Sequence, residues 1–194
     1  MSQNNIIPAF VEIIEEQTRK QIERTIWADS EYSQIEGLKN DYSGRAGELL
    51  AASICENLGI SYVYVEDQVN QNDGTYDIII NECRVEVKTA RVGNDGKTWQ
   101  HESMRDHGCD YFLFIDIDPS ALFLTIFSAN FDFSKKHPVF GRTPHLRKES
   151  NGTYKLDFGP ATLRKGIEAG LTLRIDASTT NAEIKKFFED HIRK

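Results

Sequence analysis

Two carboxylates and a lysine lie within residues 75–88 (TYDIIINECRVEVK), where their spacing could hold a metal ion. The β-branched residues on either side of positions 81–82 predict a β-hairpin with a two-residue loop. In that register Asp77 faces Glu86, and Lys88 shares the face of Glu86 because side chains alternate along a strand. Facing like charges destabilise a strand pair by up to about 1 kcal/mol. A divalent cation bound by both carboxylates would remove this repulsion.

A site of this kind suits the hydrolysis of phosphodiesters, which requires charge neutralisation and a positioned nucleophile. Asp77 and Glu86 supply the hard oxygen ligands that Mg²⁺ prefers, and the backbone carbonyl of Val87 could supply another. The ammonium group of Lys88 could hold or deprotonate the attacking water and stabilise charge on the phosphate. The alternative is an exposed sheet face on which these charges are merely solvated.

The elements that would position the hairpin follow from hydrophobic periodicity and from turn residues. The opposite face of the hairpin is apolar and should be buried; its residues are Ile78, Ile80, Cys83, Val85 and Val87. We expect helices at 6–27, 44–58, 97–107, 161–168 and 180–192. We expect further strands at 61–66, 111–117, 122–127, 153–158 and 171–175. The first helix is interpreted as a packing or dimerisation element, and the whole as an α/β protein.

The predicted helix at 44–58 carries an acid that could reach the hairpin. Its expected buried residues are Ala46, Leu49, Leu50, Ile54 and Leu58, and Gly59 suits the position after its end. Glu48 lies beside this stripe, on a flank with the small residues Ala51, Ala52 and Cys55. Small residues permit close approach to another element, so Glu48 could contribute to a site. A solvated surface charge is the simpler interpretation.

Composition restricts the class of protein. The net charge of −7 does not indicate nucleic-acid binding by itself, although residues 135–148 are locally basic. That segment is either a phosphate-binding surface or a solvated loop; its basic residues are Lys135, Lys136, Arg142, Arg147 and Lys148. No run of about 18 apolar residues and no signal peptide occur, so no membrane span is expected. Three widely spaced cysteines fit a reducing cytoplasm.

Asp77, followed on the next strand by Glu86-Val87-Lys88, resembles the PD-(D/E)xK motif of the restriction-endonuclease-like nucleases. The expected order of elements over residues 44–127 is similar to the αβββαβ core of that superfamily, a mixed central sheet flanked by helices. The resemblance implies that Asp77 and Glu86 are metal ligands, that Lys88 is the catalytic lysine and that Glu48 is an additional acid. Tyr76 stands where the motif has proline, as in many members.

The resemblance also implies an activity. The expected protein is a Mg²⁺-dependent endonuclease, with Mn²⁺ as a substitute, that cuts double-stranded DNA as a homodimer and is similar to a small type II restriction enzyme. Its alternatives are a junction resolvase, a phage, mobile-element or repair nuclease, and a non-catalytic nucleic-acid-binding module. The expected organisation is one nuclease domain with an N-terminal helical segment (1–43), a catalytic core (44–127) and a C-terminal extension (128–194).

Further residues are expected around this centre. We expect Gln100 and His101 to line the site. Both lie on the helix predicted at 97–107, which follows the strand that carries Lys88. Arg91, Lys97 and the basic residues of 135–148 would contact DNA. The acid-x-lysine triplet alone is not specific, since Glu183-Ile184-Lys185 also matches it on a predicted surface helix. The hairpin context is what distinguishes the triplet at 86–88.

Overall fold

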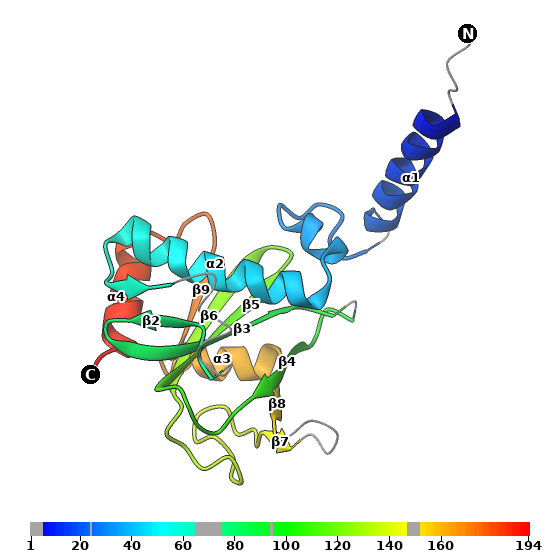
Figure 1. Ribbon diagram of the computed structural model, residues 1–194. Helices are drawn as coiled ribbons and strands as arrows, with labels where there is room; N and C mark the ends of the chain where they lie inside the picture. Colours follow the sequence, from blue (N-terminus) through cyan, green and yellow to red (C-terminus); the bar gives the residue numbers. More distant parts are fainter. Residues whose placement is uncertain (1–5, 24, 65–74, 94, 147–151) are drawn as a thin grey trace.

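The computed structural model describes residues 6–23, 25–64, 75–93, 95–146 and 152–194 (Figure 1). The helices are α1 (Ile6–Ile22), α2 (Asn40–Leu58), α3 (Pro160–Glu168) and α4 (Asn181–His191), with a 3₁₀ turn at Ser33–Gly37. The strands are β1 (Tyr62–Val63), β2 (Ile78–Ile80), β3 (Cys83–Arg91), β4 (Trp99–Met104), β5 (Tyr111–Asp118), β6 (Ala121–Ser128), β7 (His145–Leu146), β8 (Tyr154–Phe158) and β9 (Thr172–Ile175).

Six strands form the central sheet, in the order β1-β2-β3-β5-β6-β9. Strands β3 and β5 run parallel, and the other neighbours are antiparallel, so the sheet is mixed. A second sheet has the order β4-β8-β7. The expectation of an α/β protein with a mixed central sheet and helices is therefore confirmed. Strands β8 and β9, which follow residue 128, each belong to one of the two sheets.

Strand β5 forms the centre of the hydrophobic core. Every side chain from Phe112 to Ile117 is buried, as expected for a nearly continuous apolar run covered on both faces. Helix α2 lies over one face of the central sheet and α3 lies on the other (Figure 1). Glu86 and Lys88 of β3 are paired in register with Phe112 and Phe114 of β5. Glu86 and Lys88 therefore lie on the same face of the sheet as these phenylalanines.

Helix α2 lies where it was predicted, and three of its five expected buried residues, Leu50, Ile54 and Leu58, are partly buried against the core. It begins at Asn40 and ends at Leu58, with Gly59 in the left-handed conformation (φ 63°). Its fully buried residues are Gly47, Ala51, Ala52 and Cys55, whereas Ala46 and Leu49 are exposed. These small residues are the most buried because they allow α2 to approach β3 closely. A Cβ on Gly47 would lie 1.7 Å from Oγ1 of Thr89.

The prediction of a helix at 97–107 is wrong, because the chain there forms β4 and pairs with β8. Trp99 and His101 point inward, whereas Gln100 and Glu102 point outward. Buried and exposed side chains alternate along the start of β4, as in a strand with one face on the core. The segment is rich in polar residues because its other face is solvated. The element between β3 and β5 in sequence is thus a strand of the second sheet, where the expected αβββαβ core has a helix.

Helix α1 ends at Ile22, short of the predicted 27, and extends away from the rest of the chain (Figure 1). Its residues Phe10, Val11, Ile13 and Ile14 are exposed, with Phe10 61% accessible. Among the described residues, no helix combines the length and apolar character needed to cross a bilayer.

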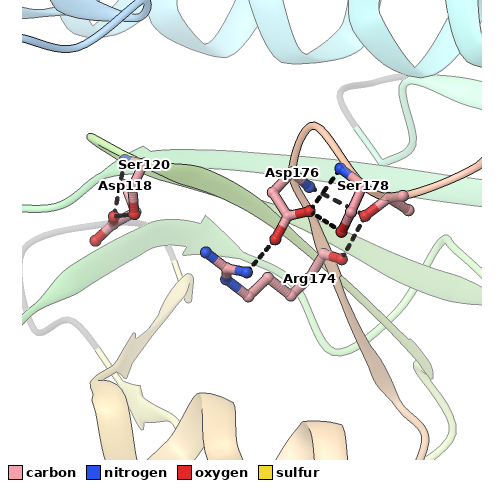
Figure 2. Close-up of polar contacts among 6 residues, drawn as sticks. Asp118, Ser120, Arg174, Asp176 and Ser178 are labelled. Atoms are coloured by element: carbon pink, nitrogen blue, oxygen red, sulfur yellow. Dashed lines mark hydrogen bonds and ion pairs between the residues drawn. The ribbon is translucent and has the colours of Figure 1, made fainter.

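The later elements agree with the predicted order, and their turns are closed by short side chains (Figure 2). Between β5 and β6, Asp118 accepts hydrogen bonds from the amide (3.0 Å) and hydroxyl (2.8 Å) of Ser120. After β9, Asp176 forms an ion pair with Arg174 and accepts hydrogen bonds from the amide (2.9 Å) and hydroxyl (2.6 Å) of Ser178. Such Asx turns satisfy backbone donors where a strand stops.

Candidate active site

The hairpin that carries the candidate site has the predicted loop and register. Asn81 and Glu82 have φ values of 48° and 64°, as a type I′ turn requires. Ile80 pairs with Cys83 and Ile78 with Val85. The predicted apolar face is buried in full, with Val87 the most accessible at 6%. This burial fixes the opposite face of β3, because slipping the register by one residue would expose every apolar side chain.

Asp77 lies directly before β2 and is fixed by two backbone hydrogen bonds to β3. Its amide donates to the carbonyl of Val85 (3.0 Å), and its Oδ2 accepts from the amide of Val87 (2.7 Å). The carboxylate is therefore positioned against β3 beside Glu86. The carbonyl of Val87 points to the same side as its amide, as in any extended strand. That carbonyl accordingly lies on the side of Asp77.

Glu86 and Lys88 form an ion pair on β3 through Oε1 and Nζ. Their side chains are only 8% and 17% exposed. Oε2 of Glu86 is buried and has no hydrogen-bond partner within the described part of the chain. Because a buried carboxylate oxygen without a partner costs free energy, the arrangement leaves a place for a further cation or donor.

The electrostatics of the cluster point the same way. Burial, followed by the charge of Glu86, raises the pKa of Asp77 from 3.8 to about 8. The ammonium group of Lys88 and the amide of Val87 oppose this rise, and Glu48 adds slightly to it. The pair Asp77–Glu86 therefore retains a proton at neutral pH unless a cation replaces it.

Glu48 approaches the cluster from α2, but other residues hold it. Its Oε2 accepts hydrogen bonds from Nη1 of Arg45 (2.8 Å) and from Oη of Tyr64 (3.2 Å). The guanidinium of Arg45 also lies over the ring of Tyr64, 5.2 Å from its centre. Sequence reasoning missed both partners. The spacing of Arg45 and Glu48 on a helix could have indicated the first, but no sequence signal indicated Tyr64.

The residues present fit a Mg²⁺ ion held mainly by water. Within the described ranges, no group of three or more His, Cys, Asp or Glu side chains is arranged to hold a metal. Two carboxylates, Asp77 and Glu86, are nevertheless sufficient, because Mg²⁺ commonly uses one or two and keeps several waters. The orphaned Oε2 of Glu86 and the proton retained by Asp77 are the features that a divalent cation would resolve.

A cleft of about 850 Å³ opens beside Lys88, between the start of α2, the end of β3 and β4. Gln100 and Arg91 line it as well, whereas Asp77 and Glu86 do not. Gln100 therefore lines the cleft beside Lys88, but it does so from a strand rather than from the predicted helix. Arg91 also donates a hydrogen bond to the carbonyl of Ile35 (3.2 Å).

His101 does not line this cleft, contrary to expectation. Its side chain is buried on the inner face of β4, where Nε2 lies 2.8 Å from Oδ1 of the buried Asp116 on β5. Strand alternation explains the difference, since neighbours of Gln100 on a strand must face the other way.

The predicted DNA-contacting residues are mostly apart from the cleft. Lys97, Lys136 and Arg142 are exposed and do not line it, and Lys135 is paired with Asp132 at 2.9 Å. Arg147 and Lys148 lie outside the described residues.

No protein-family model, curated protein or solved structure matches this chain.

Proposed function

We propose that this chain is a divalent-metal-dependent nuclease that hydrolyses DNA phosphodiester bonds. The observation that carries the proposal is the buried cluster of Asp77, Glu86 and Lys88. It pairs two close carboxylates, one of which retains a proton, with a lysine. A structural ion pair would not require the second carboxylate, because Lys88 already neutralises Glu86.

Each residue of the cluster has a distinct role in the proposal. Asp77, Glu86 and the carbonyl of Val87 would hold the Mg²⁺ ion, which would supply neutralisation and polarisation of the scissile phosphate. Lys88 would orient the attacking water, or would stabilise the charge that develops on the phosphate oxygens. Glu48, held by Arg45 and Tyr64, would support the site from α2.

Charge bookkeeping favours a phosphodiester as the substrate. The side chains Glu48, Asp77, Glu86, Arg45 and Lys88 carry a net charge of about −1 when all are ionised, which becomes about +1 with a divalent ion. A single bridging phosphodiester carries about −1, so the loaded site and the substrate are complementary.

The strand order lends further support. An antiparallel run of β1, β2 and β3 is followed by β5 parallel to β3, with the acids on β3 and at the start of β2. This arrangement is what the resemblance to restriction-endonuclease-like nucleases implies, except that β4 replaces the helix before β5. We further propose a type II restriction activity on duplex DNA, with α1 contributing to a homodimer that cuts both strands.

The test is incubation of mixed plasmid and phage DNA with Mg²⁺, comparing the wild type with Asp77→Ala and Lys88→Ala. We expect cleavage by the wild type and none by either variant, with thermal melting confirming that both fold. Discrete fragments support the restriction activity, whereas a smear supports a nuclease without sequence preference. Full activity in a folded Lys88→Ala preparation would refute the assignment.

A further inference from the structure

The outward face of β4 presents polar side chains to the space beside Lys88. Along β4, Trp99 and His101 are buried, and Gln100 and Glu102 point outward. Both outward residues line the cleft of about 850 Å³ into which Lys88 also opens. A ligand held at Lys88 would therefore extend along this face of the strand.

The charges of the cleft do not suit a tract of phosphates. Among the described residues that line it are three acidic side chains, Asp41, Asp95 and Glu102, and two cations, Lys88 and Arg91. A channel that follows a nucleic-acid backbone needs an excess of cations. No aromatic ring lines the cleft among the residues that the structure describes, so bases have no stacking platform there. The cleft could therefore recognise a ligand through hydrogen bonds between its polar side chains and polar groups of that ligand.

Lys155 of β8 gives the two outward residues different hydrogen-bonding characters. Its Nζ donates to Oε1 of Gln100 (3.0 Å) and lies 3.7 Å from Oε1 of Glu102. Because a lysine can only donate, it turns the carbonyl oxygen of Gln100 toward itself and leaves the amide nitrogen to donate. The carboxylate of Glu102 can only accept. The face thus offers a donor and an acceptor from alternate positions of one strand.

We propose that Gln100 and Glu102 read the edge of a base next to the cleaved phosphodiester, an inference that rests on the proposed nuclease function. Glu102 accepts a hydrogen bond from an exocyclic amino group, which selects adenine or cytosine at that position. Gln100 donates to the adjacent acceptor of the same base pair, which is N7 for adenine or O6 of the guanine paired with cytosine. Lys155 positions both side chains and does not itself touch the base.

The test is sequencing of the cut ends from a random-sequence duplex library digested with Mg²⁺. The wild type is compared with Glu102→Gln and Gln100→Ala. The matched control is Glu168→Gln, an equivalent change at an acid of α3 that is 69% exposed. We expect the wild type to prefer adenine or cytosine at one fixed position from the cut. Glu102→Gln should reduce that preference by about tenfold, and the control should leave it unchanged.

The outcomes separate this inference from the function on which it rests. A wild type that cuts with no preference, or whose preference survives in both Glu102→Gln and Gln100→Ala, overturns the base-reading role and leaves the nuclease assignment intact. A wild type without Mg²⁺-dependent cleavage overturns both. Should Glu102→Gln fail to fold, as judged by thermal melting, Gln100→Ala carries the test alone.

Discussion

Lowering the pH should weaken the binding of Mg²⁺ to the Asp77–Glu86 pair, because the cation must displace a proton from it. The pKa of Asp77 is raised to about 8, chiefly by burial and then by the charge of Glu86. The carboxylate form binds the metal and the protonated form does not. The affinity should therefore rise with pH and level off above about pH 8.

The size of this effect follows from the pKa. With the midpoint at about 8, roughly one molecule in ten has Asp77 ionised at pH 7 and roughly one in a hundred at pH 6. Each unit below pH 8 should thus weaken the apparent affinity about tenfold. An ordinary aspartate, ionised throughout this range, would show almost no dependence.

Isothermal titration calorimetry with MgCl₂ at several pH values measures the dependence directly. Repeating it in buffers of different ionisation enthalpy counts the protons released, and we expect about one per ion at pH 6. The matched control is Asp118→Asn, a turn aspartate that makes its contacts with Ser120. An affinity that changes less than about twofold between pH 6 and pH 8 would show that Mg²⁺ displaces no proton from Asp77, which would refute the raised pKa on which this prediction depends.

The same shift predicts how Asp77 affects stability without metal. In the folded chain Asp77 keeps a proton that it releases above pH 3.8 in the unfolded chain. The free energy of unfolding therefore falls as the pH rises from 3.8 through about 8. Asp77→Asn should therefore raise the stability of the metal-free protein at pH 9, by on the order of 2 kcal/mol. Denaturant unfolding measures this change. A less stable variant at that pH would contradict the electrostatic account.

Two further predictions concern the fold around the site. Gly47→Ala should destabilise the protein by about 2 kcal/mol, because the new Cβ would meet the side chain of Thr89, whereas Gly44→Ala has nothing within 4 Å and should be neutral or stabilising in urea unfolding. Burial lowers the pKa of His137 to about 4, so protonation favours the unfolded chain and up to about 3 kcal/mol of stability should be lost as the pH falls from 6.5 to 4. Thermal melting across this range should show the loss in wild type and in the exposed-residue control His145→Gln, but not in His137→Gln.

Local sequence determined the hairpin and the central strand. The φ > 0 positions at 81 and 82, and the alternation on either side of them, allow essentially one register with a buried apolar face. The apolar run at 112–117 likewise has one stable solution, a strand covered on both faces. These two signals suffice to bring Asp77, Glu86 and Lys88 together, because all three lie within one short hairpin.

Tertiary structure decided the features that depend on partners distant in the chain. Residues 99–104 have too little apolar periodicity to choose between helix and strand, and pairing with β8, more than fifty residues later, makes them a strand. Helix α2 buries its small residues most deeply, and leaves Leu50 and Leu58 only partly buried, because β3 passes close to Gly47. The partners of Glu48, the burial of His101 and the cleft along β4 follow from these placements. The sequence by itself determined which groups could do chemistry, and packing of distant segments determined which side chains surround them.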